Sequence, residues 1–261
     1  MKQRLLLSLA MAAALAVLAA RAEARSTSMV FWYPGEAGSS EQAQPIIDEF
    51  FKYISGKLGD ITVHGRYYNT VEGGLGYIAD RRPALGIVSF SALTQYRDKM
   101  GDPKVILATL PFPDGKPTER YALVGRGKDV KAGAIVMSSE PLETGFVRKH
   151  LFKDMPQNAV ITPTDQLFSA LKRISSGELD ALAILTPTEA ATLAKLTSVW
   201  TKGLTVIERS ESVPTARVLL FDPSFADLKK LEEALLAAGK DPDAKDILLE
   251  LRLKGFGRVR R

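Results

Sequence analysis

Short apolar runs alternate along this chain with longer amphipathic stretches. Runs rich in aliphatic and aromatic residues predict strands, and stretches with apolar positions three or four residues apart predict helices. The strands are expected at 29–33, 61–67, 84–90, 104–110, 120–125, 134–137, 159–161, 181–185, 204–208 and 217–221. The helices are expected at 40–57, 70–81, 91–97, 164–176, 188–196, 224–238 and 243–253, with one more beginning at 141. Alternation of this kind predicts an α/β fold with mainly parallel sheets flanked by helices.

The strands form two groups, separated by a turn-rich segment. Residues 111–117 contain three prolines, a glycine and an aspartate, a composition typical of a connection. Because the strands on each side are short, the pattern favours two small lobes over one large sheet.

The clearest strand–turn–helix unit lies between 134 and 152. A short buried strand is followed by a polar turn, and a helix is expected to begin at Pro141, with Glu143 near the positive end of its dipole. In open α/β sheets, small ligands bind where strands end and helices begin. The sequence therefore predicts a ligand site at this turn, with Ser138 at the strand end.

Composition limits the chemistry available to the protein. The 261 residues include no cysteine, which excludes disulfides, thiolate nucleophiles and cysteine metal sites. The net charge of +5 is mild, and no basic stripe interleaved with aromatic residues predicts nucleic-acid binding.

The first 24 residues resemble a secretory signal peptide. Lys2 and Arg4 precede an apolar run, and residues 22–24 match the small-x-small cleavage pattern. Cleavage would release a soluble and monomeric protein into the periplasm. The alternative is a retained membrane anchor.

The order of parts resembles the phosphate/phosphite/phosphonate-type family of periplasmic solute-binding proteins, which have the type II periplasmic-binding fold. The resemblance lies in QPIIDEFFKYISGKLG, YYNTVEGGLGYIADRRPALGIVSFSALTQY, TERYALVGRGKD, SSEPLETGFVRKHLF, SALKRISSGELDALAI, ERSESVPTARVLL and DPDAKDILLELRLKGFGRV, the last as the final helix. It implies lobe one at 25–116 and 208–261, lobe two at 117–207, a ligand cleft between them, and an ATP-driven permease complex in the inner membrane as partner.

The chain departs from that family where anions are bound. Leu142, Glu143 and Thr144 precede Gly145, where phosphonate binders carry small hydroxyl residues, and Thr164 stands where they often have a histidine. A carboxylate at the helix start disfavours an anion. The implied pocket is neutral to acidic and aromatic, which favours an apolar or lipid-like ligand with a hydroxyl or amine head. A true phosphonate or phosphate binder remains the alternative.

The expected ligand contacts lie at strand ends and at the lobe junction. Glu119 and Tyr121 share one face if they belong to a strand. The full set of expected contacts is Tyr33, Tyr68, Ser89, Phe90, Glu119, Tyr121, Ser138, Glu143, Thr144, Thr164 and Thr186. For Glu143 the other interpretation is a helix-dipole partner, and for the aromatic residues it is the core.

Enzyme chemistry has little support in the sequence. His64 and His150 lack the carboxylate or hydroxyl neighbours of a triad or a metal site, and no phosphate-binding glycine loop is present. We therefore expect no catalysis, no cofactor and no metal. Transport and ligand sensing, in which the closed protein engages a membrane receptor or kinase, both fit this sequence.

Overall fold

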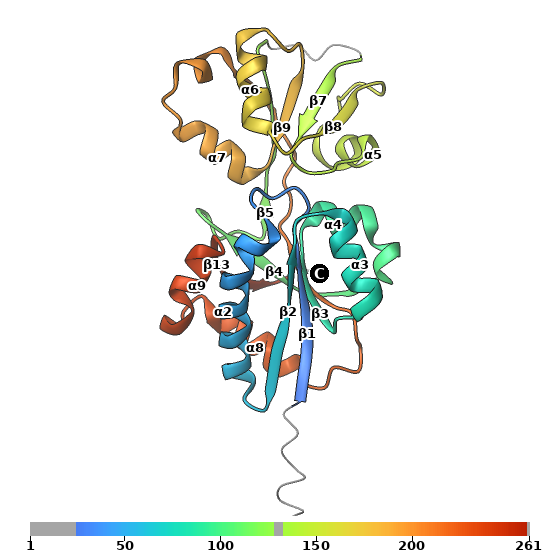
Figure 1. Cartoon of the computed structure of the whole chain (residues 1–261), viewed down its shortest axis with the longest axis vertical. Coiled ribbons are helices and arrows are strands. Elements are labelled where there is room, and N and C mark those ends of the chain that lie inside the picture. Colours follow the sequence, from blue (N-terminus) through green and yellow to red (C-terminus); the bar gives the residue numbers. More distant parts are fainter. Residues whose placement is uncertain (1–24, 128–132, 260–261) are drawn as a thin grey trace, which may run out of the picture.

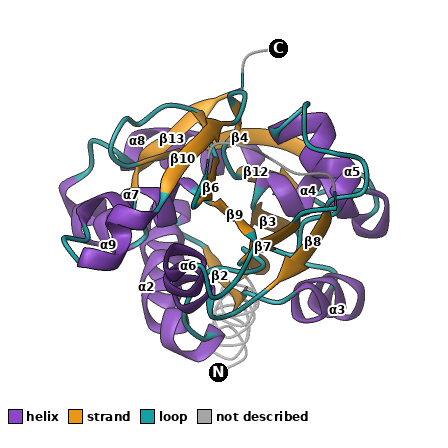
Figure 2. Cartoon of the chain, turned by 90° about the horizontal axis from the view of Figure 1, so that it is seen from above, coloured by secondary structure: helices purple, strands orange, loops and turns teal. Residues whose placement is uncertain are grey.

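The computed structural model describes residues 25–127 and 133–259, which fold into two groups of strands and helices stacked end to end (Figure 1). Each group has one sheet, and helices surround the strands when the molecule is viewed from above (Figure 2). The predicted α/β class, with sheets flanked by helices, is confirmed. The expected signal segment lies outside the described residues.

The first sheet has six strands in the order β13-β4-β12-β3-β1-β2. Its strands are β1 (Arg25–Trp32), β2 (Ile61–Tyr68), β3 (Leu85–Val88), β4 (Lys104–Pro111), β12 (Arg217–Leu220) and β13 (Leu253–Arg258). Its helices are α2 (Ser40–Leu58), α3 (Val71–Arg81), α4 (Phe90–Tyr96), α8 (Leu228–Ala238) and α9 (Lys245–Glu250). We call this part lobe one.

Helix α2 illustrates how local sequence builds this lobe. Ser39 accepts a hydrogen bond from the Gln42 N–H, and the Gln42 side chain accepts one from the Ser39 N–H, which forms a capping box. Phe50 and Ile54 then enter the core of lobe one beside β1 and β2. Pro45 lies inside the helix rather than in its first turn, because the helix already begins at Ser40.

The second sheet has five strands in the order β10-β6-β9-β7-β8. Its strands are β6 (Ala122–Gly125), β7 (Ile135–Ser138), β8 (Val160–Pro163), β9 (Leu182–Leu185) and β10 (Thr205–Arg209). Its helices are α5 (Thr144–Phe146), continued by a π-helical turn at Val147–Leu151, then α6 (Leu167–Ser176) and α7 (Pro187–Lys195). We call this part lobe two.

Both sheets are mixed rather than mainly parallel. β1 pairs in parallel with β2 and β3, and β7 does so with β8 and β9. The strands on either side of each chain crossing, β4, β12, β6 and β10, pair antiparallel to their neighbours. The parallel part of each sheet therefore comes from its strand–helix–strand units, and the antiparallel part comes from the crossings between lobes.

The chain crosses twice between the two sheets, and the crossings pair with each other. β5 (Thr118–Glu119) and β11 (Val213–Pro214) form a two-stranded antiparallel ladder, and Figure 1 shows β5 between the lobes. β10 continues to Arg209 and pairs there with Ala122, so the second sheet spans 122–209, whereas the expected boundary was 207.

Several predicted elements end earlier or begin later than expected, and three of them bear on the junction or on the end of the described chain. The strand expected at 84–90 stops at Val88, because Ser89 caps α4 and Phe90 begins that helix. The helix expected from Pro141 begins only at Thr144. The prediction of a final helix through residue 253 is wrong: α9 stops at Glu250, and the chain returns as β13. In the described part of the chain, no helix is both long and apolar enough to cross a membrane.

Candidate functional site

The carboxyl ends of the parallel strands in the two lobes face each other across the junction. In lobe one the chain leaves β1 through Tyr33, Pro34 and Gly35. In lobe two it leaves β7 through Ser139 and Glu140. The two turns touch, since a Cβ added to Gly35 would lie 2.3 Å from the carbonyl oxygen of Ser139. The lobes are therefore in direct contact at the place where open α/β sheets bind ligands.

A buried carboxyl group lies at this contact. Glu140 is 8% exposed, and its Oε2 accepts a hydrogen bond from the Tyr121 hydroxyl at 3.0 Å. The hydroxyl of Ser91, in α4 of lobe one, lies near this carboxyl group and lowers its pKa. Burial above all, and then the charge of Glu119, raise the pKa of Glu140 from 4.5 to about 8. Glu140 thus accepts a hydrogen bond from lobe two and lies near a hydroxyl group of lobe one.

A second carboxyl group lies on the crossing strand β5. Burial raises the pKa of Glu119 from 4.5 to about 7, although the positive charge of Arg217 opposes this shift. Arg217 donates to the Thr215 hydroxyl at 3.3 Å. The charge of Glu119 also helps to raise the pKa values of Tyr33 and Tyr121, for which burial is the largest cause. These five side chains make the junction polar, with one carboxyl group, one guanidinium group and three hydroxyl groups.

Gln95 of α4 connects lobe one to the start of α5 in lobe two. Its Oε1 accepts a hydrogen bond from the Glu143 backbone N–H at 2.6 Å, and its Nε2 donates to the Pro141 carbonyl at 3.4 Å. Beside it, the Phe90 ring packs against Phe146 at 5.9 Å and against His150 at 5.7 Å between centroids. The first N–H at this helix end is therefore already bonded to a side chain of the other lobe.

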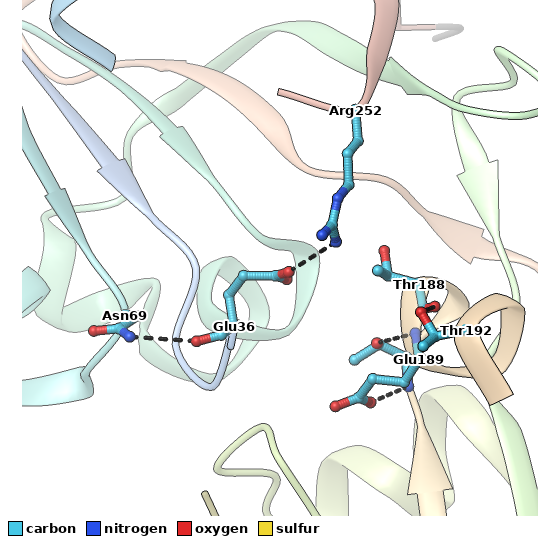
Figure 3. Close-up of polar contacts among 7 residues, drawn as sticks. Glu36, Asn69, Thr188, Glu189, Thr192 and Arg252 are labelled. Carbon is cyan, nitrogen blue, oxygen red and sulfur yellow. Dashed lines mark hydrogen bonds and ion pairs between the residues drawn. The ribbon is translucent and has the colours of Figure 1, made fainter. Parts of the chain in front are cut away.

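The opposite side of the junction carries charges from both lobes. Glu36, in the loop after β1, pairs with Arg252 at 3.4 Å, and its carbonyl accepts from Asn69 at 3.3 Å (Figure 3). Facing them, Glu189 of α7 accepts from the Thr186 backbone N–H at 2.8 Å. Burial raises the pKa of Glu36, the positive charge of Arg252 opposes this shift, and the charge of Glu189 adds to it. Arg252 thus lies where two like charges from opposite lobes approach each other.

Several expected contact residues serve as caps or strand ends. The hydroxyls of Ser89 and Thr186 cap α4 and α7. The Thr164 hydroxyl accepts from the Gln166 N–H at 3.1 Å, and the Thr164 N–H donates to the buried Ser138 carbonyl at 2.8 Å. These hydroxyl groups lie at the junction side of their sheets and are partly used by the local backbone.

The remaining expected residues divide between the junction and other surroundings. Tyr33, Phe90, Glu119 and Tyr121 lie among the contacts described above. Tyr68 packs against Tyr77 of α3 at 5.4 Å. Glu143 is the exposed residue before α5, without a side-chain cap bond, and Thr144 is the first residue of that helix.

Other aromatic residues of the predicted strands, turns and helices mostly belong to the cores. Trp32 is fully buried and its indole N–H donates to the Thr70 carbonyl at 2.9 Å. Tyr67 belongs to the core of lobe one, and Phe146 to that of lobe two. Phe112 is 46% exposed and lies beneath Lys254. Most of the aromatic side chains that could have lined the implied pocket are therefore used in core packing.

Sequence reasoning missed Glu140, Ser91 and Gln95. Glu140 lies two residues after the end of β7. The sequence predicted a polar turn there but did not show whether Glu140 or Glu143 would be the buried acid at the junction. Ser91 lies two residues after Ser89 and Gln95 five residues after Phe90, so helical spacing of three or four residues from the predicted junction residues did not point to either one.

Two surface hollows lie away from the junction. One, of about 760 Å³, is bordered by Lys172, Arg173 and Trp200 in lobe two. The other, of about 470 Å³, is bordered by Asp48, His64 and Arg81 in lobe one. Among residues 25–127 and 133–259, no group of histidine and acidic side chains is arranged to hold a metal ion.

No protein-family model and no curated protein matches this chain. Solved structures do match over most of its length. The binding-protein component of a phosphonate ABC transporter from Pseudomonas aeruginosa is 13% identical, with a TM-score of 0.63 over 91% of this chain and 82% of that one.

Two further structures are similar to the same extent. A Xanthomonas citri protein solved with ATP is 12% identical, with a TM-score of 0.67 over 90% of this chain and 92% of that one. PhnD1 from Prochlorococcus marinus, solved with methylphosphonate, is 15% identical, with a TM-score of 0.64 over 91% and 94%. The chain therefore has the fold of the phosphonate-type binding components of ABC transporters, a type II periplasmic-binding fold.

Proposed function

We propose that this protein is a periplasmic solute-binding protein that delivers a small molecule to an ABC-type permease complex. The observation that carries this proposal is the buried polar contact between the lobes, where Tyr121 and Glu140 meet Ser91. The shared fold supports the same role, because clefts between lobes are common ligand sites. Closure of the lobes over the ligand would be the signal that the permease recognises.

The proposed ligand is a small molecule with a hydrogen-bond-donating head, such as a hydroxyl or an amine. Glu119 and Glu140 would accept hydrogen bonds from that head, and Phe90 would contact an apolar body. Because Trp32 and Tyr67 are already used in packing, a compact apolar body fits better than a long lipid chain.

The proposed lobes are 25–116 with 210–261, and 117–209, after removal of the signal segment; the expected boundary at 207 moves by two residues because β10 continues to Arg209. The paired crossings β5 and β11 support a hinge at this boundary. Opening at the hinge would separate Gly35 from Ser139 and expose the carboxyl group of Glu140 to solvent. Access of the ligand to the strand ends requires that movement.

Mass spectrometry of small molecules that co-purify with the protein from native periplasm tests this function. We expect one dominant ligand that is lost from a Tyr121→Phe variant, in which the hydroxyl that holds Glu140 is missing. The matched control is Tyr77→Phe, since Tyr77 lies on α3 against Tyr68. The absence of any enriched small molecule would contradict the proposal.

Uptake of the identified ligand then distinguishes transport from sensing. A strain that lacks the gene should lose uptake of that ligand and regain it with the wild-type gene. Unchanged uptake, together with loss of a transcriptional response to the ligand, would assign the protein to a sensor system instead.

A further inference from the structure

Glu140 is held between the lobes by donors that would otherwise be free to bind a ligand. Tyr121, just before β6 in lobe two, donates to Oε2 at 3.0 Å. Ser91, in lobe one, lies near the same carboxyl group and lowers its pKa, and its hydroxyl is 3.1 Å from the Ser89 hydroxyl. Tyr121 and Ser91 are each 2% exposed. The Glu140 carboxyl group is therefore buried between the lobes among hydroxyl groups, one of which donates a hydrogen bond to it.

The backbone around Glu140 shows that this position is closed. The Cα of Glu140 would lie 2.6 Å from a Cβ added to Gly35, so the turn after β1 rests directly on the turn after β7. The neighbouring Glu143 N–H is bonded to Gln95 of the other lobe. Two donors at this turn, the Tyr121 hydroxyl and the Glu143 N–H, are therefore occupied by the chain's own side chains, whereas the buried Ser139 hydroxyl has no hydrogen-bond partner among the described residues.

Negative charge at the junction also disfavours the binding of an anion. Glu119 and Glu189 are the acidic neighbours that raise the pKa of Glu140, and the positive charge of Arg217 acts on Glu119. Above their raised pKa values of about 7 and about 8, Glu119 and Glu140 carry charge, and an external anion would meet both carboxylates in surroundings that screen charge poorly. Proteins of the same fold have been solved with methylphosphonate, ATP or chloride, which are all anions.

We propose that Glu140 determines the ligand specificity of this protein: its carboxyl group fills the position of an anionic ligand group between the lobes, and the cleft therefore excludes phosphate and phosphonates. This inference deepens the proposed function and rests on a ligand site between the lobes. It assigns the selective role to a buried side chain of the β7 turn, whereas the sequence alone pointed to Glu143.

Acetate binding to a variant that lacks the Glu140 carboxyl group tests this role. Glu140→Ala removes one methylene and the carboxyl group, a fragment of the size and shape of acetate. We expect acetate to raise the melting temperature of Glu140→Ala in a saturable manner, compared with chloride at equal ionic strength. Wild type and Glu49→Ala, which removes an exposed glutamate on α2, should show no such difference.

Calorimetry of the wild type with methylphosphonate and with inorganic phosphate is the second measurement, and we expect no saturable heat. Saturable binding of either anion by the wild type, or equal effects of acetate on Glu140→Ala and Glu49→Ala, would overturn the inference. If Glu140→Ala does not stay folded, recovery of folded protein on refolding with acetate rather than chloride replaces the melting measurement under the same criterion. These probes need no native ligand, so this test can succeed where the search for a transported solute fails.

Discussion

Closure of the lobes should take up protons, and the substitution Glu140→Gln should remove most of this effect. In the closed structure burial raises the pKa of Glu140 from 4.5 to about 8. Opening returns the carboxyl group to water without unfolding either sheet, so we take the lower value for the open form. A raised pKa in the closed form means that closure is favoured fully below 4.5 and that this advantage is lost as the pH rises through 8.

The size of the effect follows from the same shift. At about 1.4 kcal/mol per pKa unit, the shift of Glu140 corresponds to roughly 5 kcal/mol in the opening equilibrium. Glu119 adds a smaller part in the same direction, because burial raises its pKa to about 7. Gln can still accept the Tyr121 hydrogen bond but carries no charge at any pH. We therefore expect Glu140→Gln to stay closed at alkaline pH, where the wild type opens.

The distance between the lobes is the direct measurement. Because the chain has no cysteine, Lys52→Cys in α2 and Lys172→Cys in α6 would be the only labelling sites for fluorescence energy transfer. In wild type the transfer should fall as the pH rises from 5 to 9, in Glu140→Gln it should fall less, and in the double variant Glu119→Gln/Glu140→Gln it should stay flat. Identical pH profiles in the wild type and the double variant, or opening as the pH falls, would refute this reasoning.

Three other substitutions give expected outcomes. Gly35→Ala should hold the lobes apart and weaken ligand binding at least about tenfold in calorimetry, because its Cβ would lie 2.3 Å from the backbone of the other lobe. The control Gly101→Ala, also at positive φ but with open space around it, should bind the ligand normally. Equal ligand affinities of the two variants would contradict the contact between the lobes. Gln95→Ala should lower the energy-transfer signal at neutral pH, since it removes both bonds to the start of α5; an unchanged signal would mean that these bonds do not hold the lobes together. Ser39→Ala should lower the free energy of unfolding by about 1 kcal/mol in urea titration without changing ligand affinity, because it removes only the cap of α2; a change in affinity would contradict that separation.

The periodicity of the sequence predicted most elements because each carries its own local cause. Helix α2 begins where Ser39 can cap it, and α7 begins at the Thr186 capping box. Strand β13 could not be predicted in this way. Its sequence LKGFGR contains two glycines, and it becomes a strand only because it pairs with β4.

The candidate site was predictable in position but not in detail. Hydroxyl residues after β3 and β9 indicated strand ends at a junction, and Ser89 and Thr186 do lie there as caps. Which glutamate would be buried at the junction could not be predicted from the sequence. Glu143 has the expected place beside a helix start, yet its side chain is exposed. Burial of Glu140 depends on Ser91 and Gly35, which are far away in the sequence and come close only when the two lobes meet.

This dependence on the other lobe explains why a carboxyl group can act here as a specificity element. A buried, partly charged acid costs free energy unless hydroxyl or cationic partners surround it. Tyr121 would hold Glu140 in either state, whereas Ser91 reaches it only when the lobes close. A ligand that supplies donors to Glu140 in the open cleft would keep that carboxyl group satisfied as the lobes close, whereas an anion would compete with it for the same hydroxyl groups. The rejection of anions and closure around a donor-bearing ligand thus both follow from Glu140, because its carboxyl group is buried only when the two lobes are in contact.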